Sequence, residues 1–218
     1  MRARRRYRTC LALLTALAAA GASHAQNPSG ITLSLAPIPV QVSQSNGSGT
    51  DRLSGMTLGG MADLAWRIWR LDLRYLEGGI SAGDDSESED IVEGELMIGV
   101  APLSWLVIKV GPHIRSFVTP QGTERWFFWE ARLGTAAQLG SPNVITYFQV
   151  WHVFKSDVDA VQSYDSGNGL EGGIRLSLSR LPFYGGLSYR VDHSNLGSGA
   201  ASQTVEQIVM AIGWLIGR

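Results

Sequence analysis

Apolar and polar side chains alternate residue by residue along most of the chain after about residue 30. In Trp69–Tyr75 the odd positions are apolar, and Arg70, Asp72 and Arg74 lie between them. The same alternation recurs in Val92–Val100 and again near the C-terminus. A period of two places successive side chains on opposite faces of a β-strand, whereas an amphipathic helix requires a period of about 3.6. The sequence therefore predicts an all-β protein.

Ten segments carry this pattern or a less regular version of it, and an eight-stranded arrangement is the alternative. In the seventh segment Gln149 and His152 fall on opposite faces, and this blurred register indicates a β-bulge. The predicted strands are 30–42, 53–66, 69–81, 91–101, 105–117, 125–139, 144–155, 169–178, 183–193 and 203–216.

The predicted connections are of two kinds that alternate along the chain. Short turns follow the even strands, and longer segments rich in Gly, Ser and Asp follow the odd strands. One end of the sheet then has tight turns and the other has long loops, with both chain termini at the tight-turn end. This is the layout of an antiparallel up-and-down transmembrane β-barrel. The predicted long loops are Ser43–Arg52, Ala82–Asp90, Val118–Glu124, Lys155–Asn168 and His193–Ser202.

The two faces of the predicted strands differ in chemistry, since one is apolar and the other carries seven bases and six acids. The alternative folds are a soluble β-sandwich and a lipid-carrier barrel. A sandwich could bury so many ions only at a large desolvation cost, whereas the lumen of a membrane barrel can hydrate or pair them. Because about ten strands enclose a narrow lumen, we interpret the charges as an ion-pair network rather than an open conduit. The predicted lumen charges are Arg70, Asp72, Arg74, Glu93, Glu95, Lys109, Arg115, Glu130, Arg132, Glu171, Arg175, Arg190 and Asp192.

Aromatic residues gather near the two ends of the predicted strands. Amphipathic rings favour the headgroup level of a bilayer, so a membrane barrel is expected to have two aromatic girdles. The predicted girdle residues are Trp66, Trp69, Trp105, Trp126, Trp129 and Trp214.

The first 25 residues have the composition of a targeting segment. Met1–Arg8 contains five arginines and no acid, Leu11–Gly21 is apolar, and small residues stand at −3 and −1 of a cut before Gln26. These three features together indicate a secretory signal peptide. We predict that residues 1–25 are cleaved and that 26–218 form one outer-membrane barrel domain.

Charge and cysteine content narrow the class of the mature chain. Removing the five arginines of the leader leaves 18 − 5 = 13 basic residues against 19 acidic ones, a net charge of −6. This acidic balance argues against nucleic acid as a partner. The one cysteine, Cys10, lies in the leader, so neither disulfides nor a thiolate metal site is expected.

The alternating strands, the aromatic positions and the leader together make the chain resemble small bacterial outer-membrane β-barrel proteins over residues 30–218. The resemblance implies a location in the bacterial outer membrane and contact with outer-membrane lipid and lipopolysaccharide. It also implies that the secretion translocon and the barrel-assembly machinery are partners during biogenesis.

The candidate catalytic residues lie around the loop of the last predicted hairpin. His193, Ser194 and, on the next strand, Glu206 resemble the site of the outer-membrane lipid A deacylases, which use a His, a Ser and an acid on adjacent strands. In that family one residue separates His and Ser, whereas adjacent residues on a strand point to opposite faces. The other two histidines of the mature chain, His113 and His152, are likewise predicted near the loop-side ends of their strands.

No pattern in the chain predicts a metal or a cofactor. Asp84–Asp90 has five acids within seven residues, but it lacks the spacing and the glycine of an EF-hand, and we interpret it as a solvated surface loop. The sequence thus predicts a non-catalytic outer-membrane barrel of structural or interaction type with a charge-filled lumen. A hydrolase of the lipid A deacylase type and a narrow channel are the alternatives.

Overall fold

The computed structural model describes residues 30–45, 49–83, 88–119, 122–159, 163–197 and 201–216. These residues form ten antiparallel strands that close into a single barrel, because β1 pairs with both β2 and β10. The predicted all-β barrel of ten strands is confirmed, and the eight-stranded alternative is wrong. The strands are β1 Gly30–Ser45, β2 Thr50–Trp66, β3 Trp69–Ser81, β4 Glu89–Leu103, β5 Leu106–Thr119, β6 Gly122–Leu139, β7 Ser141–Asp159, β8 Tyr164–Ser177, β9 Phe183–Leu196 and β10 Ala201–Ile216.

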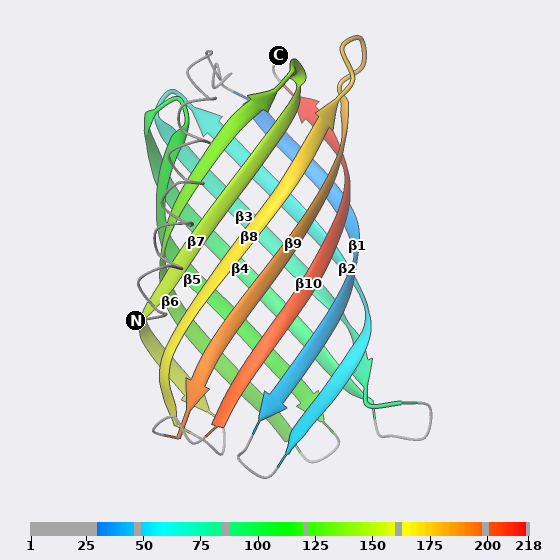
Figure 1. Cartoon of the computed structure of the whole chain (residues 1–218), viewed down its shortest axis with the longest axis vertical. Helices are drawn as coiled ribbons and strands as arrows, with labels where there is room; N and C mark the ends of the chain where they lie inside the picture. The colour runs from blue at the N-terminus through cyan, green and yellow to red at the C-terminus, as the bar shows by residue number, and fades with distance from the viewer. Residues whose placement is uncertain are drawn as a thin grey trace, which may run out of the picture.

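The strands lie oblique to the long axis of the barrel (Figure 1). β1 begins and β10 ends at the top of this view, together with the short β2–β3, β4–β5 and β6–β7 turns. We call this the turn end, and the opposite end the loop end. No helix within the described ranges is long and apolar enough to cross a membrane.

The outer wall of the barrel is apolar and exposed. Ile212, Leu35 and Leu58 are 72%, 68% and 64% exposed, although their strands, β10, β1 and β2, are each hydrogen-bonded on both sides. Inward positions on these strands are buried, and on β9 and β5 the side chains of Arg190 and Arg115 are among the least exposed. These exposed apolar residues therefore point away from the barrel axis and the buried charges toward it, which is the arrangement of a transmembrane barrel rather than of a soluble β-sandwich.

The strands continue further toward the loop end than the alternation predicts. Most of the predicted loop Val118–Glu124 is strand, because β5 extends to Thr119, β6 begins at Gly122 and these two residues pair. Likewise, Ser43 pairs with Arg52 inside another predicted loop. Here the strands remain hydrogen-bonded although their two faces do not differ in side-chain polarity. The alternation of apolar and polar residues therefore underestimates strand length at the loop end.

A β-bulge interrupts the pairing of β6 with β7, as the blurred register of the seventh segment predicts. Trp129 pairs with Lys155 and Glu130 with Val153, so Phe154 is the extra residue. The bulge changes which positions of β7 face the lumen: Val153 is buried before it, and Val158 faces inward after it.

Two sequence predictions fall on residues outside the described ranges. These are the signal peptide, residues 1–25, and the central part of the acidic loop, residues 84–87. They remain predictions.

Candidate functional site

The middle of the lumen is filled by charged side chains that converge from several strands. β-Strand alternation points them inward, and their side chains are at most 8% exposed. Nine of the thirteen predicted lumen charges lie here, together with His113, which is buried in mid-barrel instead of near the loop end as predicted. We call this set the central ion cluster: Arg74, Glu93, Glu95, His113, Arg115, Glu130, Arg132, Glu171, Arg190 and Asp192.

Arg190 on β9 joins carboxylates from two strands. Its Nε lies 2.9 Å from Asp192 Oδ2, its Nη1 bonds Glu95, and its Nη2 lies 3.8 Å from Glu93 Oε1. Arg115 extends the network, because its Nε donates to Glu93 at 2.9 Å and its Nη2 to Asp192 at 3.0 Å. Paired and hydrogen-bonded charges of this kind tolerate burial that isolated charges do not.

Two of these guanidinium groups contact the same indole ring. Arg132 and Arg190 each place the guanidinium carbon 4.7 Å from the Trp151 ring centroid, within the range of a cation–π contact. The Trp151 Nε1 donates to Asp192 at 2.9 Å, so the ring is also fixed at its edge. The sequence analysis did not identify Trp151 as part of the lumen, although it shares the inward parity of Gln149.

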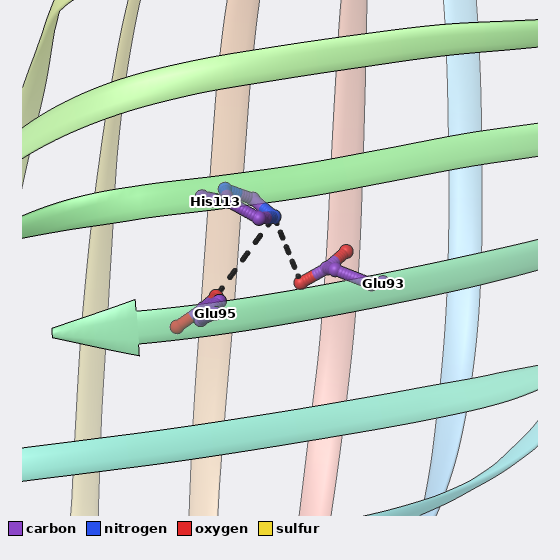
Figure 2. Close-up of side chains that lie close together, drawn as sticks. All are labelled: Glu93, Glu95 and His113. Atoms are coloured by element: carbon purple, nitrogen blue, oxygen red, sulfur yellow. Dashed lines mark ion pairs between the residues drawn. The ribbon is translucent and has the colours of Figure 1, made fainter.

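His113 contacts carboxylates on both neighbouring strands. Its Nδ1 lies 2.6 Å from Glu130 Oε1, and its Nε2 lies 3.3 Å from Glu93 Oε1 and 3.9 Å from Glu95 Oε1. Figure 2 shows the imidazole pointing toward the last two. An imidazole with three nearby carboxylates is a donor set that could hold a metal ion in principle.

The same carboxylates, however, are already bound by arginines. Glu95 and Glu130 lie 3.0 and 2.6 Å from Arg132 nitrogens, and Glu93 accepts from Arg115. A divalent cation would have to displace or face guanidinium groups at each of these contacts. Five carboxylates and four guanidiniums leave one negative charge, which a protonated imidazole would balance. The geometry therefore fits an ion-pair network better than a metal site.

The remaining four predicted lumen charges lie toward the turn end and are more solvated. Lys109 bonds Asp72, and their side chains are 19% and 24% exposed. Arg70 donates to backbone carbonyls of the adjacent turn, and Arg175 stacks on Tyr184. The lumen thus becomes more accessible to water toward this end.

Apolar side chains fill the lumen on the loop side of the ion cluster, and the sequence analysis did not predict them there. Trp126 packs against Phe117 and Phe128 with ring centroids 6.4 and 6.0 Å apart, and Phe128 contacts His113 at 5.6 Å. On β1 and β10 the apolar set continues past the row of Gln207 and Arg190 toward the turn end, at Ala36, Ile38 and Val209. We call the set the apolar layer: Ala36, Ile38, Val40, Val42, Leu76, Ile80, Ile91, Phe117, Trp126, Phe128, Val153, Leu196, Val205 and Val209.

The aromatic girdle prediction is wrong for Trp126, which is 2% exposed inside the barrel. Trp126 is separated from Glu130 and Arg132 by an even number of residues, so on a β-strand all three side chains point to the same face. This spacing could have predicted the inward position of Trp126. Trp66, Trp69 and Trp214 are exposed on the outer wall at the turn end, as is Trp105 in the β4–β5 turn. Trp129 faces outward near the loop end and packs against Phe127 at 6.2 Å.

The structure does not bring the three candidate catalytic residues together. Ser194 is buried in the lumen, whereas His193 is exposed on the outer wall, where its Nδ1 lies 3.0 Å from Thr204 Oγ1. Glu206 also faces outward and accepts a hydrogen bond from Tyr189. A serine nucleophile and its histidine base would have to be within hydrogen-bond reach, and here the barrel wall separates them.

The fold and the lumen together define a small β-barrel of the outer-membrane type. No protein-family model matches the sequence, and no curated protein matches it at a significant level. Among solved structures, the translocator domain of the autotransporter NalP from Neisseria meningitidis is 12% identical, with 96% of this chain and 95% of that chain covered and a TM-score of 0.52.

Two other outer-membrane barrels align less well. Ail, the attachment invasion locus protein of Yersinia pestis, is 9% identical over 86% of this chain and 99% of that chain, with a TM-score of 0.39. The toluene transporter TodX of Pseudomonas putida is 11% identical over 91% and 74%, with a TM-score of 0.36. At these identities the similarity concerns the fold alone, and it rests on the alignment with the NalP domain.

Proposed function

We propose that the mature chain is an outer-membrane barrel whose role is structural or interactive and whose lumen is closed. The observation that carries this proposal is the filling of the lumen by the central ion cluster and the apolar layer. Val42, Ile91, Phe117 and Trp126 are at most 2% exposed on the loop side, and Arg190 and Glu93 are at most 1% exposed in the middle. A solute entering from the loop end would meet an apolar barrier first.

The height of the apolar outer wall supports the membrane assignment. Eight residues separate Trp214 at the turn end from Glu206, where the outward positions of β10 become polar. Eight strand residues span about 26 Å, or about 20 Å along the axis at a tilt of about 40°, which is close to the apolar band of about 25 Å of an outer-membrane barrel. Because the barrel is closed, every strand hydrogen-bonds to a neighbour on each side, and these bonds satisfy backbone groups that hydrocarbon could not. On this proposal, lipid and lipopolysaccharide surround the wall, and the secretion translocon and barrel-assembly machinery deliver it.

Membrane insertion can be tested by electrophoresis. The purified chain, folded into lipid vesicles, is expected to migrate at a different apparent mass from the boiled chain in detergent, because a closed ladder of this length resists unfolding without heat. The unheated sample should also resist added protease over the barrel. Identical migration of heated and unheated samples, together with complete proteolysis, would contradict the membrane assignment.

A closed lumen predicts very low ion conductance. The folded chain in planar bilayers is expected to show no sustained unitary openings, whereas a 16-stranded porin inserted in the same way serves as the conducting control, since its lumen is a water-filled channel. Steady openings that scale with salt concentration would instead favour the narrow-channel alternative and contradict the closed lumen.

A further inference from the structure

Two prolines interrupt the seam at which the first and last strands close the barrel. β1 and β10 lie side by side (Figure 1), and β1 pairs with β10 at residues 31–35 and again at residues 40–45. Between these stretches the described strands have no β1–β10 pairs at residues 36–39, of which the second and the fourth are prolines. Proline has no N–H to donate to a ladder and is found in sheets mainly on edge strands or at bulges. We call residues 36–39 together with the facing residues 208–211 the seam gap.

The register identifies the hydrogen bonds that the prolines remove. The pairs on the two sides of the seam gap share one register, which places Pro37 opposite Met210 and Pro39 opposite Ile208. β1 pairs with β2 without interruption over the same residues, so the missing N–H groups are on the β10 side. The carbonyls of Met210 and Ile208 therefore receive no hydrogen bond from β1. Pro112 interrupts the β4–β5 pairing in the same way, but over two residues instead of four.

On its other side, β1 is attached firmly to β2 along the seam gap. Every residue of β1 has a partner on β2. Thr57 Oγ1 on β2 also donates a hydrogen bond to the Ile38 carbonyl at 2.8 Å. The Ile38 side chain leans toward β2, because its Cδ1 lies 2.7 Å from the position that a Cβ atom would take at Gly59. If the wall separates at the seam gap, β1 therefore stays with β2 and parts from β10.

The seam gap lies at the middle of the apolar wall. Met210 is four residues from Trp214 and four from Glu206, the two ends of the apolar stretch of β10. Hydrocarbon offers no donor to an unpaired carbonyl, so the closed state is stabilised less here than where the ladder is complete. Segments with fewer hydrogen bonds open locally at a lower free energy than the rest of a protein. The seam gap is therefore the part of the β1–β10 wall that opens most easily.

Both faces of the seam gap are apolar. Ala36, Ile38 and Val209 point into the lumen and belong to the apolar layer. Pro37 and Met210 are exposed on the outer wall. Separation of the two strands here would bring hydrocarbon against apolar side chains and not against the central ion cluster.

We propose that the seam gap opens laterally within the bilayer and gives apolar molecules dissolved there access to the apolar layer. The paired stretches at residues 31–35 and 40–45 keep the two strands joined at both ends of the opening. This inference rests on the proposed membrane location. It is compatible with a lumen closed to ions, because the opening faces hydrocarbon and not the water at either end of the barrel.

Lateral opening can be measured by labelling a buried cysteine in lipid vesicles. Residues 26–218 contain no cysteine, so an introduced one is labelled specifically. Val209 in the seam gap and Val205 in the paired stretch both point inward on β10 and are 3% and 1% exposed. With a maleimide that partitions into the bilayer, Val209→Cys is expected to react about tenfold faster than Val205→Cys, the matched control, since two fewer hydrogen bonds hold the wall closed beside it.

Restoring the ladder tests whether the prolines are the cause. Pro37→Val/Pro39→Val supplies two N–H groups for the carbonyls of Met210 and Ile208. In this background the labelling of Val209→Cys is expected to slow about tenfold, because each restored hydrogen bond stabilises the closed seam. A charged maleimide, which stays in water, should not label Val209→Cys with or without the prolines.

Equal labelling of the two cysteines, or an unchanged rate in the proline variant, would overturn the lateral opening. Labelling of Val209→Cys by the charged reagent at the same rate would also overturn it, since access would then run through the lumen. If Val209→Cys does not fold, Ala36→Cys reports from β1, and the single proline variants replace a double variant that does not fold. Loss of heat-modifiable migration in the wild-type chain would contradict the membrane location itself, whereas its retention with equal labelling contradicts only the opening.

Discussion

Arg190→Met is expected to destabilise the barrel by about 3–5 kcal/mol, the typical cost of leaving buried charges without their partner. Arg190 is fully buried and contacts Glu93, Glu95 and Asp192. It also covers one face of Trp151. Methionine keeps most of the side-chain length but removes the charge and every hydrogen bond, so the cluster gains an uncompensated negative charge. Urea unfolding in lipid vesicles, followed by tryptophan fluorescence, measures the loss.

A compensating change tests whether charge balance is the cause. Adding Glu95→Gln to the Arg190→Met background removes one carboxylate, and the double variant is expected to be less destabilised than the sum of the single variants. Arg180→Met, in the exposed β8–β9 turn, is the matched control and should change stability by less than about 0.5 kcal/mol. Wild-type stability in Arg190→Met would show that the cluster contributes little.

Much of the barrel could be predicted because one physical property is periodic. Lipid contacts one face of every strand, so side-chain polarity alternates along it. The orientation of residues such as Leu71 and Asp72 can therefore be predicted from their polarity. The same alternation predicted thirteen charged residues in the lumen, although none of their contacts was known. It failed where the environment on the two faces is similar. Beyond the apolar band, Ser43 and Arg52 pair in a ladder that no polarity contrast marks.

The partners within the lumen could not be predicted, since they depend on the register of the whole sheet. Arg190 and Glu95 are 95 residues apart in sequence and meet across the lumen. Trp126 was misplaced because an aromatic residue near a strand end suits an outer girdle and an inner apolar layer equally well. Only its parity distinguishes the two. Similarly, His113 is near the loop end by sequence, but extension of β5 to Thr119 places it in mid-barrel.

The close packing of the lumen leads to a second large effect, at Gly169 on β8. A Cβ atom at this position would lie 2.2 Å from Trp151 Cε2 and 2.3 Å from Cζ2. The indole cannot move aside easily, because Arg132 and Arg190 stack on it and Asp192 accepts from its Nε1. Glycine is required here for space, so that the ring can lie against the β8 backbone.

Gly169→Ala is therefore expected to cost about 3 kcal/mol, at the upper part of the range for overpacking a core, and to lower the yield of heat-modifiable barrel. Gly94→Ala is the matched control, because a Cβ there meets nothing within 4 Å, and it should fold as wild type does. In a Trp151→Leu background the alanine should add almost no further loss, since the ring that it meets is gone. If Gly169→Ala unfolds at the same urea concentration as Gly94→Ala, the indole is not held where the two arginines place it, and the lumen is less tightly packed than a closed barrel requires.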